Sequence, residues 1–213
     1  MIIAVDGPAA SGKGTIAKAL ARHYGLPHLD TGLLYRAVGE SVRRHELNPE
    51  IEADAVAASD FDDSLLDDPA LRSDDAGKFA SIVSAHPLVR AALMQRQRRF
   101  ARQPGGAVLD GRDIGTVIAP DADAKLFVRA TPTIRAKRRH AELRLRGSTV
   151  SLDRVLADIR ARDLRDSTRA MAPMVPAADA ALLDTSFLSI EASVQRAIAI
   201  VEARLQHKPV PLG

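Results

Sequence analysis

The chain has 213 residues, of which 46% are hydrophobic and 27% charged, with a formal net charge of +3, a composition typical of a folded globular protein. The absence of Cys excludes disulfide scaffolds, iron–sulfur clusters, thiolate zinc sites and cysteine nucleophiles. Because no apolar run approaches the roughly 18 residues of a membrane span and the N-terminal sequence lacks the charged lead of a signal peptide, we expect a cytoplasmic protein without a membrane partner.

Short apolar runs alternate along the chain with segments that have helical spacing. The runs predict buried strands at residues 1–6, 26–29, 107–110, 125–128 and 181–183. The spacing predicts helices at residues 13–23, 32–45, 131–146, 151–166 and 189–206, the last three with Ser or Thr at or just before their first residue. This alternation predicts an α/β fold with a doubly wound parallel sheet. Residues 208–213, which contain two prolines, are predicted to form a loose tail.

The strongest motif is the string GPAASGKGT, which follows the first predicted strand and opens the first predicted helix. Glycines allow backbone N–H groups to turn towards a phosphate, the helix N-terminus adds partial positive charge, and the lysine reaches the β- and γ-phosphates. The pattern therefore predicts an ATP site made by Gly7, Pro8, Ala9, Ala10, Ser11, Gly12, Lys13, Gly14 and Thr15. Gly14 stands where the general pattern has Ser or Thr, so direct binding of Mg²⁺ by Thr15 is left open.

An acidic residue, Asp110, ends the predicted strand at 107–110. A carboxylate at this place faces the phosphate loop in a parallel sheet and is typical of a group that organises Mg²⁺, directly or through water. The string DGRD that begins at Asp110 also fits a tight turn, which would explain its glycine but not the two charges that follow.

Several charged residues share a predicted helical face. The spacing of four and three residues between Arg162, Asp166 and Arg169 places all three on one face if the helix extends that far. Arg135 likewise shares a face with Arg138 or Arg139. A surface ladder of ion pairs is the alternative interpretation for these residues.

The strings GPAASGKGT, LDTGLLYRAV, ASIVSAHPLVR, RQRRF, DGRDIGTV, RARDLRDSTR and APMVPAADAALLDTS occur in this order. From Met1 to about Glu202 the chain thereby resembles the bacterial cytidylate kinases. The resemblance implies a P-loop fold with a five-stranded parallel sheet, a nucleotide-binding insertion after the second helix and a short mobile lid. It implies a monomer that uses ATP and Mg²⁺ to phosphorylate CMP or dCMP. We expect a core of residues 1–36, 93–137 and 163–207, an insertion at 37–92 and a lid at 138–162.

The resemblance also implies roles for individual residues. The expected catalytic residues are Lys13, Asp110, Arg112, Arg135, Arg139 and Arg162, and the expected CMP-binding residues are Thr31, Tyr35, Arg36, Ser81, Arg90, Arg112, Asp113, Arg162, Asp166 and Arg169. Ser81 and Arg90 are expected at the cytosine edge, Arg36 at the acceptor phosphate and Asp166 at the ribose hydroxyls. With only 3% aromatic residues, the chain must read a base mainly by hydrogen bonds.

Some of these residues have simpler interpretations. Thr31 and Arg36 fit a helix cap followed by a solvated arginine, Arg90 fits a surface position, and the arginines of RQRRF fit a solvated helix face. The insertion is shorter than in many bacterial relatives. Its residues 54–72 are acidic and turn-prone and show no alternating strands.

The charge distribution leaves a different class of function to consider. Residues 46–75 hold eleven acidic residues and one arginine, whereas residues 135–169 hold eleven basic and five acidic residues. The basic run fits solvated helix faces or a polyanion site, including a nucleotide-gated module that binds nucleic acid. The interspersed acids and the scarcity of aromatic residues argue against nucleic acid. A kinase for another nucleoside monophosphate or a small metabolite is the nearer alternative.

Overall fold

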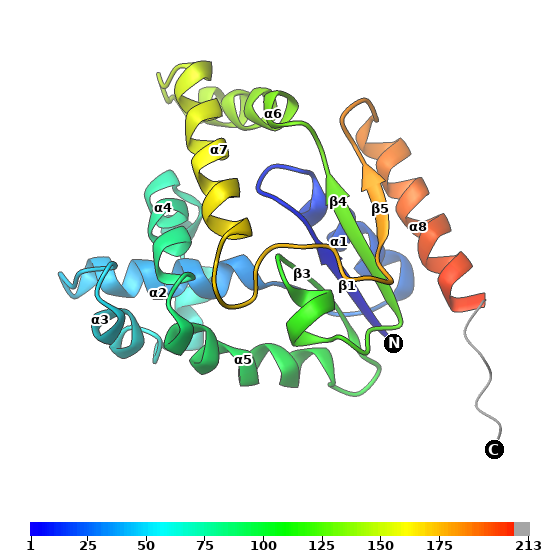
Figure 1. Cartoon of the computed structure of the whole chain (residues 1–213), viewed down its shortest axis with the longest axis horizontal. Coiled ribbons are helices and arrows are strands. Elements are labelled where there is room, and N and C mark those ends of the chain that lie inside the picture. The colour runs from blue at the N-terminus through cyan, green and yellow to red at the C-terminus, as the bar shows by residue number, and fades with distance from the viewer. Residues whose placement is uncertain (207–213) are drawn as a thin grey trace.

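A parallel five-stranded sheet forms the centre of the protein (Figure 1). The computed structural model describes residues 1–206, with only the backbone of Asp74, so the expected tail at 208–213 lies outside the described residues. The strands are β1 (Ile2–Asp6), β2 (His28–Asp30), β3 (Ala107–Gly111), β4 (Ala124–Arg129) and β5 (Ala181–Asp184), in the order β2-β3-β1-β4-β5. All neighbouring pairs are parallel, so the carboxyl ends of the strands meet at one edge of the sheet. The predicted α/β class is confirmed.

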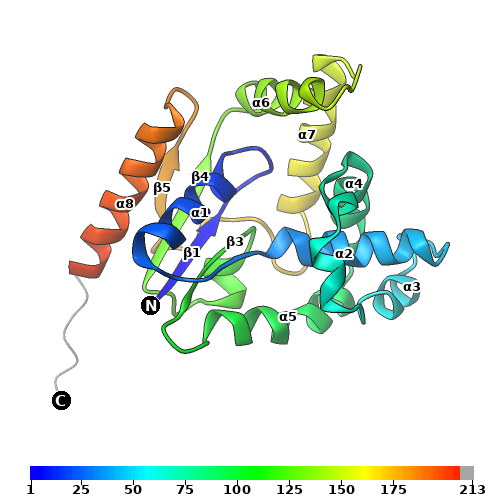
Figure 2. The ribbon, with the colours of Figure 1, turned by 180° about the vertical axis from the view of Figure 1, so that it is seen from behind.

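The helices cover both faces of this sheet (Figure 2). They are α1 (Lys13–Tyr24), α2 (Thr31–Arg44), α3 (Glu52–Ala57), α4 (Asp74–Val83), α5 (Pro87–Ala101), α6 (Pro132–Leu145), α7 (Leu152–Ser167) and α8 (Ile190–Gln206). Side chains alternate along β1, so Ile3 and Val5 pack in one core with α1 and α8. Ala4 packs in a second core with α5 and the short π-helix Ile114–Ile118.

Two further cores stabilise the parts that stand above the carboxyl edge. Helices α2 to α5 share buried residues that include Leu34, Val38 and Val89. Helices α6 and α7 form a hairpin with its own small core, which includes Ala136 and Ile159. Figure 1 shows α7 beside α4, and these two helices are in contact. The hairpin and the insertion therefore meet across the edge of the sheet where the strands end.

The expected division into core, insertion and lid does not coincide with breaks in the secondary structure. Helices α2, α5, α6 and α7 each run without interruption through one of the four expected boundaries. The predicted second strand begins two residues later than expected, at His28. The sequence patterns did not indicate the helices α3 and α4, and they indicated α5 only through the helix face expected for the arginines of RQRRF. Helix α7 ends at Ser167, so the expectation of a helical face that includes Arg169 is wrong.

The acidic stretch of the insertion forms short turns instead of strands. Two 3-10 turns, Asp63–Asp67 and Pro69–Arg72, are each preceded by an aspartate, Asp62 and Asp68, whose carboxylate accepts a backbone N–H from inside the turn. Asp68 is one of these caps and also pairs with Arg44 of helix α2. Part of the acidity is therefore explained by capping, because carboxylates are preferred at such positions.

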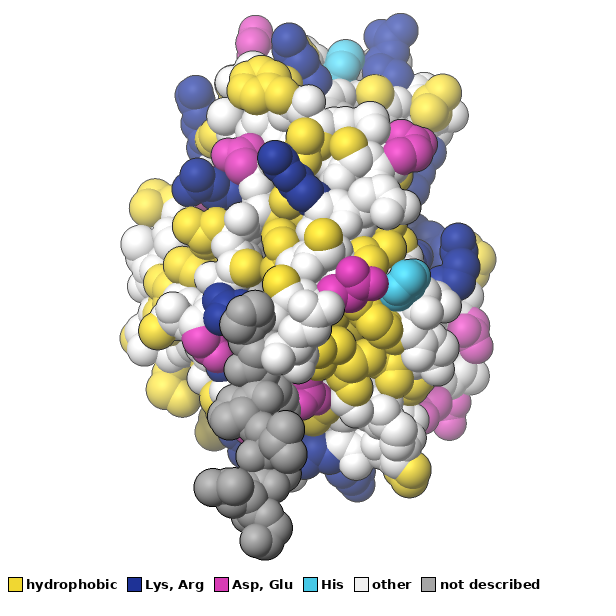
Figure 3. Space-filling view, turned by 90° about the vertical axis from the view of Figure 1, so that its right-hand side faces the viewer, with side chains coloured by type: hydrophobic (Ala, Val, Ile, Leu, Met, Phe, Trp, Pro, Cys, Tyr) yellow, Lys and Arg dark blue, Asp and Glu magenta, His cyan; other side chains and the backbone are white. Residues whose placement is uncertain are grey.

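Exposed hydrophobic side chains are scattered on the face that carries α8. Figure 3 shows this face, where hydrophobic side chains lie between charged ones. Phe187, just before α8, and Ile190, its first residue, are both exposed large hydrophobic residues. Among the helices within residues 1–206, none combines the length and the hydropathy that crossing a membrane requires.

Close packing of α2 on α4 leads to a prediction for Gly39. A Cβ at this position would lie 2.7 Å from the Cβ of Phe79 and 3.1 Å from the backbone nitrogen of Ala80. Alanine favours a helix over glycine by about 1 kcal/mol, but overpacking costs typically about 1–3 kcal/mol. Gly39→Ala should therefore lower the free energy of unfolding, measured by urea denaturation. Arg22→Ala, on the exposed side of α1, should change it by no more than about 0.5 kcal/mol. Unchanged or increased stability of the Gly39 variant would contradict the packing argument.

Candidate functional site

The loop between β1 and α1 has the backbone of a phosphate-binding loop. Gly7 and Gly12 have φ angles of 148° and 90°, which favour glycine. A Cβ on Gly7 would lie 2.0 Å from the carbonyl oxygen of Val128 on β4, so the loop leaves the sheet in direct backbone contact with its neighbour. Lys13 is the first residue of α1, and Thr15 is exposed in its first turn.

Side chains from other elements hold the outer side of this loop. The hydroxyl of Thr185, which follows β5, donates to the carbonyl of Ser11 at 2.8 Å. Arg138 of α6 donates to the same carbonyl and to both the hydroxyl and the carbonyl of Thr185. Arg135 donates to the carbonyl of Ala9 at 3.2 Å. These bonds fix the carbonyl groups of Ala9 and Ser11 in the loop.

The arginines of α6 that were predicted to be catalytic differ in their surroundings. Arg135 is buried and forms a two-nitrogen contact with both carboxylate oxygens of Asp163 on α7. It therefore joins the two helices of the hairpin and supports the loop. Arg139 lines the cleft and pairs with Glu142 on its own helix, at 3.0 Å.

Two carboxylates face the loop from the ends of β2 and β3. Asp30 and Asp110 are partners in the register of these strands. The Asp110 carboxylate lies 3.7 Å from the position of a Cβ on Gly14, and its other oxygen is 2.7 Å from Nε2 of His28. Burial and the neighbouring Asp110 raise the pKa of Asp30. Two carboxylates that disfavour each other's charge in this way favour a cation beside them.

Lys13 lies among charges of both signs. Burial and then the Arg112 guanidinium lower the pKa of Lys13 to about 8, while Asp110 and Asp30 act against this shift. Burial and Arg112 likewise lower the pKa of Arg162 to about 10. The cations at this edge therefore repel one another, which is the condition that an incoming polyanion relieves.

A second group of predicted residues lies beside the loop after β3. Arg90 and Asp113 form a buried ion pair, and the Arg90 guanidinium lies 5.5 Å from the centre of the Tyr35 ring. Arg90 is therefore not the surface residue that its position after Pro87 also allowed. Thr31 donates to the carbonyl of Asp110 at 2.9 Å and so fixes the end of β3.

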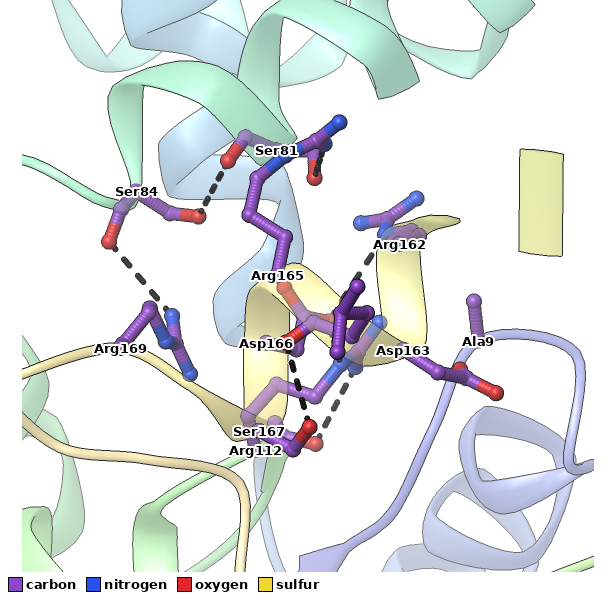
Figure 4. Close-up of polar contacts among 12 residues, drawn as sticks. Ala9, Ser81, Ser84, Arg112, Arg162, Asp163, Arg165, Asp166, Ser167 and Arg169 are labelled. Atoms are coloured by element: carbon purple, nitrogen blue, oxygen red, sulfur yellow. Dashed lines mark hydrogen bonds and ion pairs between the residues drawn. The ribbon is translucent and has the colours of Figure 1, made fainter. Parts of the chain in front are cut away.

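Asp166 is the centre of a cluster of arginines (Figure 4). Its carboxylate accepts from Nε of Arg112 at 2.9 Å and lies 3.9 Å from Nε of Arg162. Burial acts to raise the pKa of Asp166, but Arg112, Arg162 and Arg169 outweigh it, so that the pKa is lowered. Arg169 lies beyond α7 and contacts the carbonyl of Ser84 at 3.5 Å.

Helix α7 also contacts the insertion through a residue that sequence reasoning missed. Arg165 donates to the hydroxyl of Ser81 on α4, as Figure 4 shows. Arg36 of α2 donates to the carbonyls of Leu71 and Ser73, at 2.7 and 2.9 Å. The insertion therefore holds Arg36 with its backbone.

Only some of these groups open onto the cleft between the loop, the insertion and the helix hairpin. The predicted residues that do not line it are Gly7, Pro8, Thr31, Tyr35, Arg90, Asp110, Arg112, Asp113, Arg135, Asp166 and Arg169. The cleft has a volume of about 1310 Å³. It exceeds the roughly 300–1,000 Å³ of common small-ligand pockets. The predicted residues that line it are Ala9, Ala10, Ser11, Gly12, Lys13, Gly14, Thr15, Arg36, Ser81, Arg139 and Arg162. Asp30, Arg138, Arg165 and Thr185 also line it and were not predicted. The arginines of RQRRF lie away from it, and Arg98 donates to the carbonyl of Val117 instead of facing only solvent.

Comparison with known proteins assigns the chain to a family. A sequence model of the cytidylate kinase family matches residues 3–203. The chain is 61% identical to a cytidylate kinase of Xanthobacter autotrophicus over 204 residues, which cover 96% of this chain and 98% of the relative. It is 59% identical to a cytidylate kinase of Bradyrhizobium over 204 residues, covering 95% and 96%. A crystal structure of an uncharacterized protein from Eubacterium ventriosum shares the fold, with a TM-score of 0.55, 15% identity and coverage of 95% and 99%. The chain belongs to the cytidylate kinase family.

Proposed function

We propose that this protein transfers the γ-phosphoryl group of ATP to CMP or dCMP and releases ADP and CDP or dCDP. The observation that carries the proposal is the shared cleft, in which Lys13 of the phosphate loop faces Arg36 and Ser81 of the insertion. A cleft of this volume has room for a donor and an acceptor nucleotide. Family membership supports the same reaction, since its curated relatives are named cytidylate kinases.

The reaction needs positioning and cations more than covalent chemistry. An oxygen of the acceptor phosphate forms a bond to the γ-phosphorus, and the bond from that phosphorus to the β–γ bridging oxygen breaks as ADP leaves. The attacking oxygen is already ionised, so no general base is required. Residues 7–15 hold the ATP phosphates in this proposal, and Lys13, Arg112, Arg135, Arg139 and Arg162 stabilise the charge on the moving group, either directly or by supporting the loop.

The acceptor site in this proposal contains the second group of residues. Its members are Thr31, Tyr35, Arg36, Ser81, Arg90, Arg112, Asp113, Arg162, Asp166 and Arg169. Arg36 binds the acceptor phosphate, and Ser81, Arg90 and Asp113 read the base by hydrogen bonds. Asp166, which Arg112 and Arg162 orient, holds the ribose hydroxyls. The Tyr35 ring and the Arg90 guanidinium form a wall for the base.

Phosphoryl transfer from ATP generally uses Mg²⁺, and the residues present fit this ion. Within residues 1–206, no three His, Asp or Glu side chains are arranged to hold a metal on their own. Mg²⁺ commonly binds through one or two carboxylates together with substrate phosphates. Asp110 would hold the ion, directly or through water, with Thr15 as a further oxygen ligand. The ion would neutralise phosphate charge during the transfer.

We further propose three parts for this cycle: the core at residues 1–36, 93–137 and 163–207, the acceptor insertion at 37–92 and the lid at 138–162. The Arg146 guanidinium, in the lid, donates to the carbonyl of Arg72 in the insertion at 2.8 Å, and this contact supports closure of the lid over the acceptor part. Closure would exclude water and so suppress hydrolysis of ATP. We propose that the chain works as a monomer and without nucleic acid.

An assay of ADP release tests the function directly. With ATP as donor, CMP and dCMP should give the highest kcat/KM among CMP, dCMP, UMP, AMP and dTMP, because the polar base site matches cytosine. A preference for AMP or dTMP would overturn the cytidine assignment and leave a kinase for another nucleotide. Absence of turnover together with steeply salt-dependent binding of RNA or DNA would favour the nucleic-acid alternative instead.

The lowered pKa of Lys13 predicts how ATP binding depends on pH. The lysine is cationic below its pKa of about 8 in the free protein and neutral above it. Raising the pH from 7.5 to 9.5 should therefore weaken ATP binding, by about tenfold one unit above the pKa. Isothermal titration calorimetry measures this directly. Lys13→Met should bind ATP weakly and show no such pH dependence. An affinity of the unmodified protein that stays constant up to pH 9.5 would refute the assignment.

A further inference from the structure

Asp6 is a buried carboxylate that the proposed reaction leaves without a role. It ends β1, directly before the phosphate loop, and is 5% exposed. One of its oxygens accepts the backbone N–H of Ile114 and the other accepts that of Gly115, both at 2.8 Å. Both oxygens are thus committed to a segment that is more than 100 residues away in the sequence.

The two N–H groups begin the short π-helix that follows Asp113. An aspartate in front of a helix usually accepts such an N–H itself. The Asp113 side chain makes no capping bond, because it pairs with Arg90 in the acceptor site. Asp6, at the end of β1, therefore caps the π-helix in place of Asp113.

The contact depends on a close approach of the two segments. A Cβ on Gly115 would lie 3.4 Å from an Asp6 oxygen and 3.1 Å from Cδ of Lys125. The glycine thus leaves space for the carboxylate beside the backbone that it caps. Any side chain at position 115 would push the carboxylate or the lysine aside.

Burial makes the ionised form of the Asp6 carboxyl group unfavourable. Burial raises the pKa of Asp6 to about 7; the two N–H groups act against this shift, and Asp113 adds to it. An asparagine would avoid the charge but offers a single oxygen, so it could cap only one of the two N–H groups. Ionisable groups held at such a cost are concentrated at functional sites.

We propose that Asp6 is a positioning residue for the acceptor nucleotide: it caps residues 114 and 115 and thereby leaves the Asp113 carboxylate to the base site. This inference rests on the proposed function. Because Gly7 follows Asp6 directly, the last residue of β1 also connects the donor loop with the acceptor loop. The other end of β1 offers a matched control, since Asp123 accepts the N–H of Ile2 at 2.6 Å, away from the cleft.

Steady-state kinetics of two variants test the proposal. Asp6→Asn should raise KM for CMP by about tenfold or more, the effect of losing a bond to a charged group. It should leave KM for ATP within about twofold of the value for the unmodified protein. A general disturbance of the phosphate loop would instead raise KM for ATP as well. Asp123→Asn should change neither constant by more than about twofold. An unchanged KM for CMP in Asp6→Asn, or an equal rise for both substrates, would overturn the proposal.

A double-mutant cycle separates an effect through Asp113 from a merely structural one. If Asp6 acts through Asp113, the variant with both Asp6→Asn and Asp113→Asn should have a KM for CMP within about twofold of Asp113→Asn alone. Multiplicative effects would overturn the proposal.

A second variant covers the case in which Asp6→Asn does not fold, as judged by circular dichroism. Gly115→Ala keeps the carboxylate but displaces it, and it should give the same selective rise in KM for CMP; an unchanged constant would overturn the proposal. Absence of CMP turnover by the unmodified protein would refute the proposed function itself. Normal turnover that is insensitive to both substitutions would refute only the role of Asp6.

Discussion

Repulsion between cations is the constraint on which the rest of this structure depends. A site for two phosphate-bearing ligands requires many positive groups at one edge of a sheet, where burial strengthens their mutual repulsion. The fold separates them with carboxylates: Asp166 lies between Arg112 and Arg162, and Asp113 and Asp163 each pair with a buried arginine. Within residues 1–206, Lys13 forms no hydrogen bond or ion pair with a carboxylate, and burial and the Arg112 guanidinium lower its pKa.

The parallel sheet makes this arrangement possible because strands far apart in sequence end at the same edge. Residues after β1, β2, β3 and β5 all contribute to the cleft or its support. The loop at the centre is held by α6 and by Thr185, and the acceptor side is held by α2 and the insertion. Helix α7 connects both sides, since Asp163 contacts α6 and Arg165 contacts α4. The phosphate loop, the insertion and the helix hairpin therefore share supports.

The sequence was sufficient to predict features that depend on local patterns. The five strands, the glycine-rich turn between the first strand and the first helix, and the helices at both ends of the chain follow from apolar runs, glycines and helical spacing, and the structure confirms them. It was not sufficient for contacts between distant segments. His28 and Thr185 carry no local signal, because their partners Asp110 and Ser11 are brought to them only by strand order and helix packing. Helix α5 was indicated only in part because it is contacted on several sides and has a weak amphipathic pattern.

The direct contact between Gly7 and the carbonyl of Val128 limits how the nucleotide loop can vary. With 2.0 Å between that oxygen and any added Cβ, the first residue of the loop is interlocked with the backbone of β4. A substitution there cannot be absorbed by a rotamer change, because the obstacle is main chain and not a flexible side chain. A side chain at position 7 would therefore affect ligand binding and folding together, because it would displace the loop and push against the backbone of β4 at the same time.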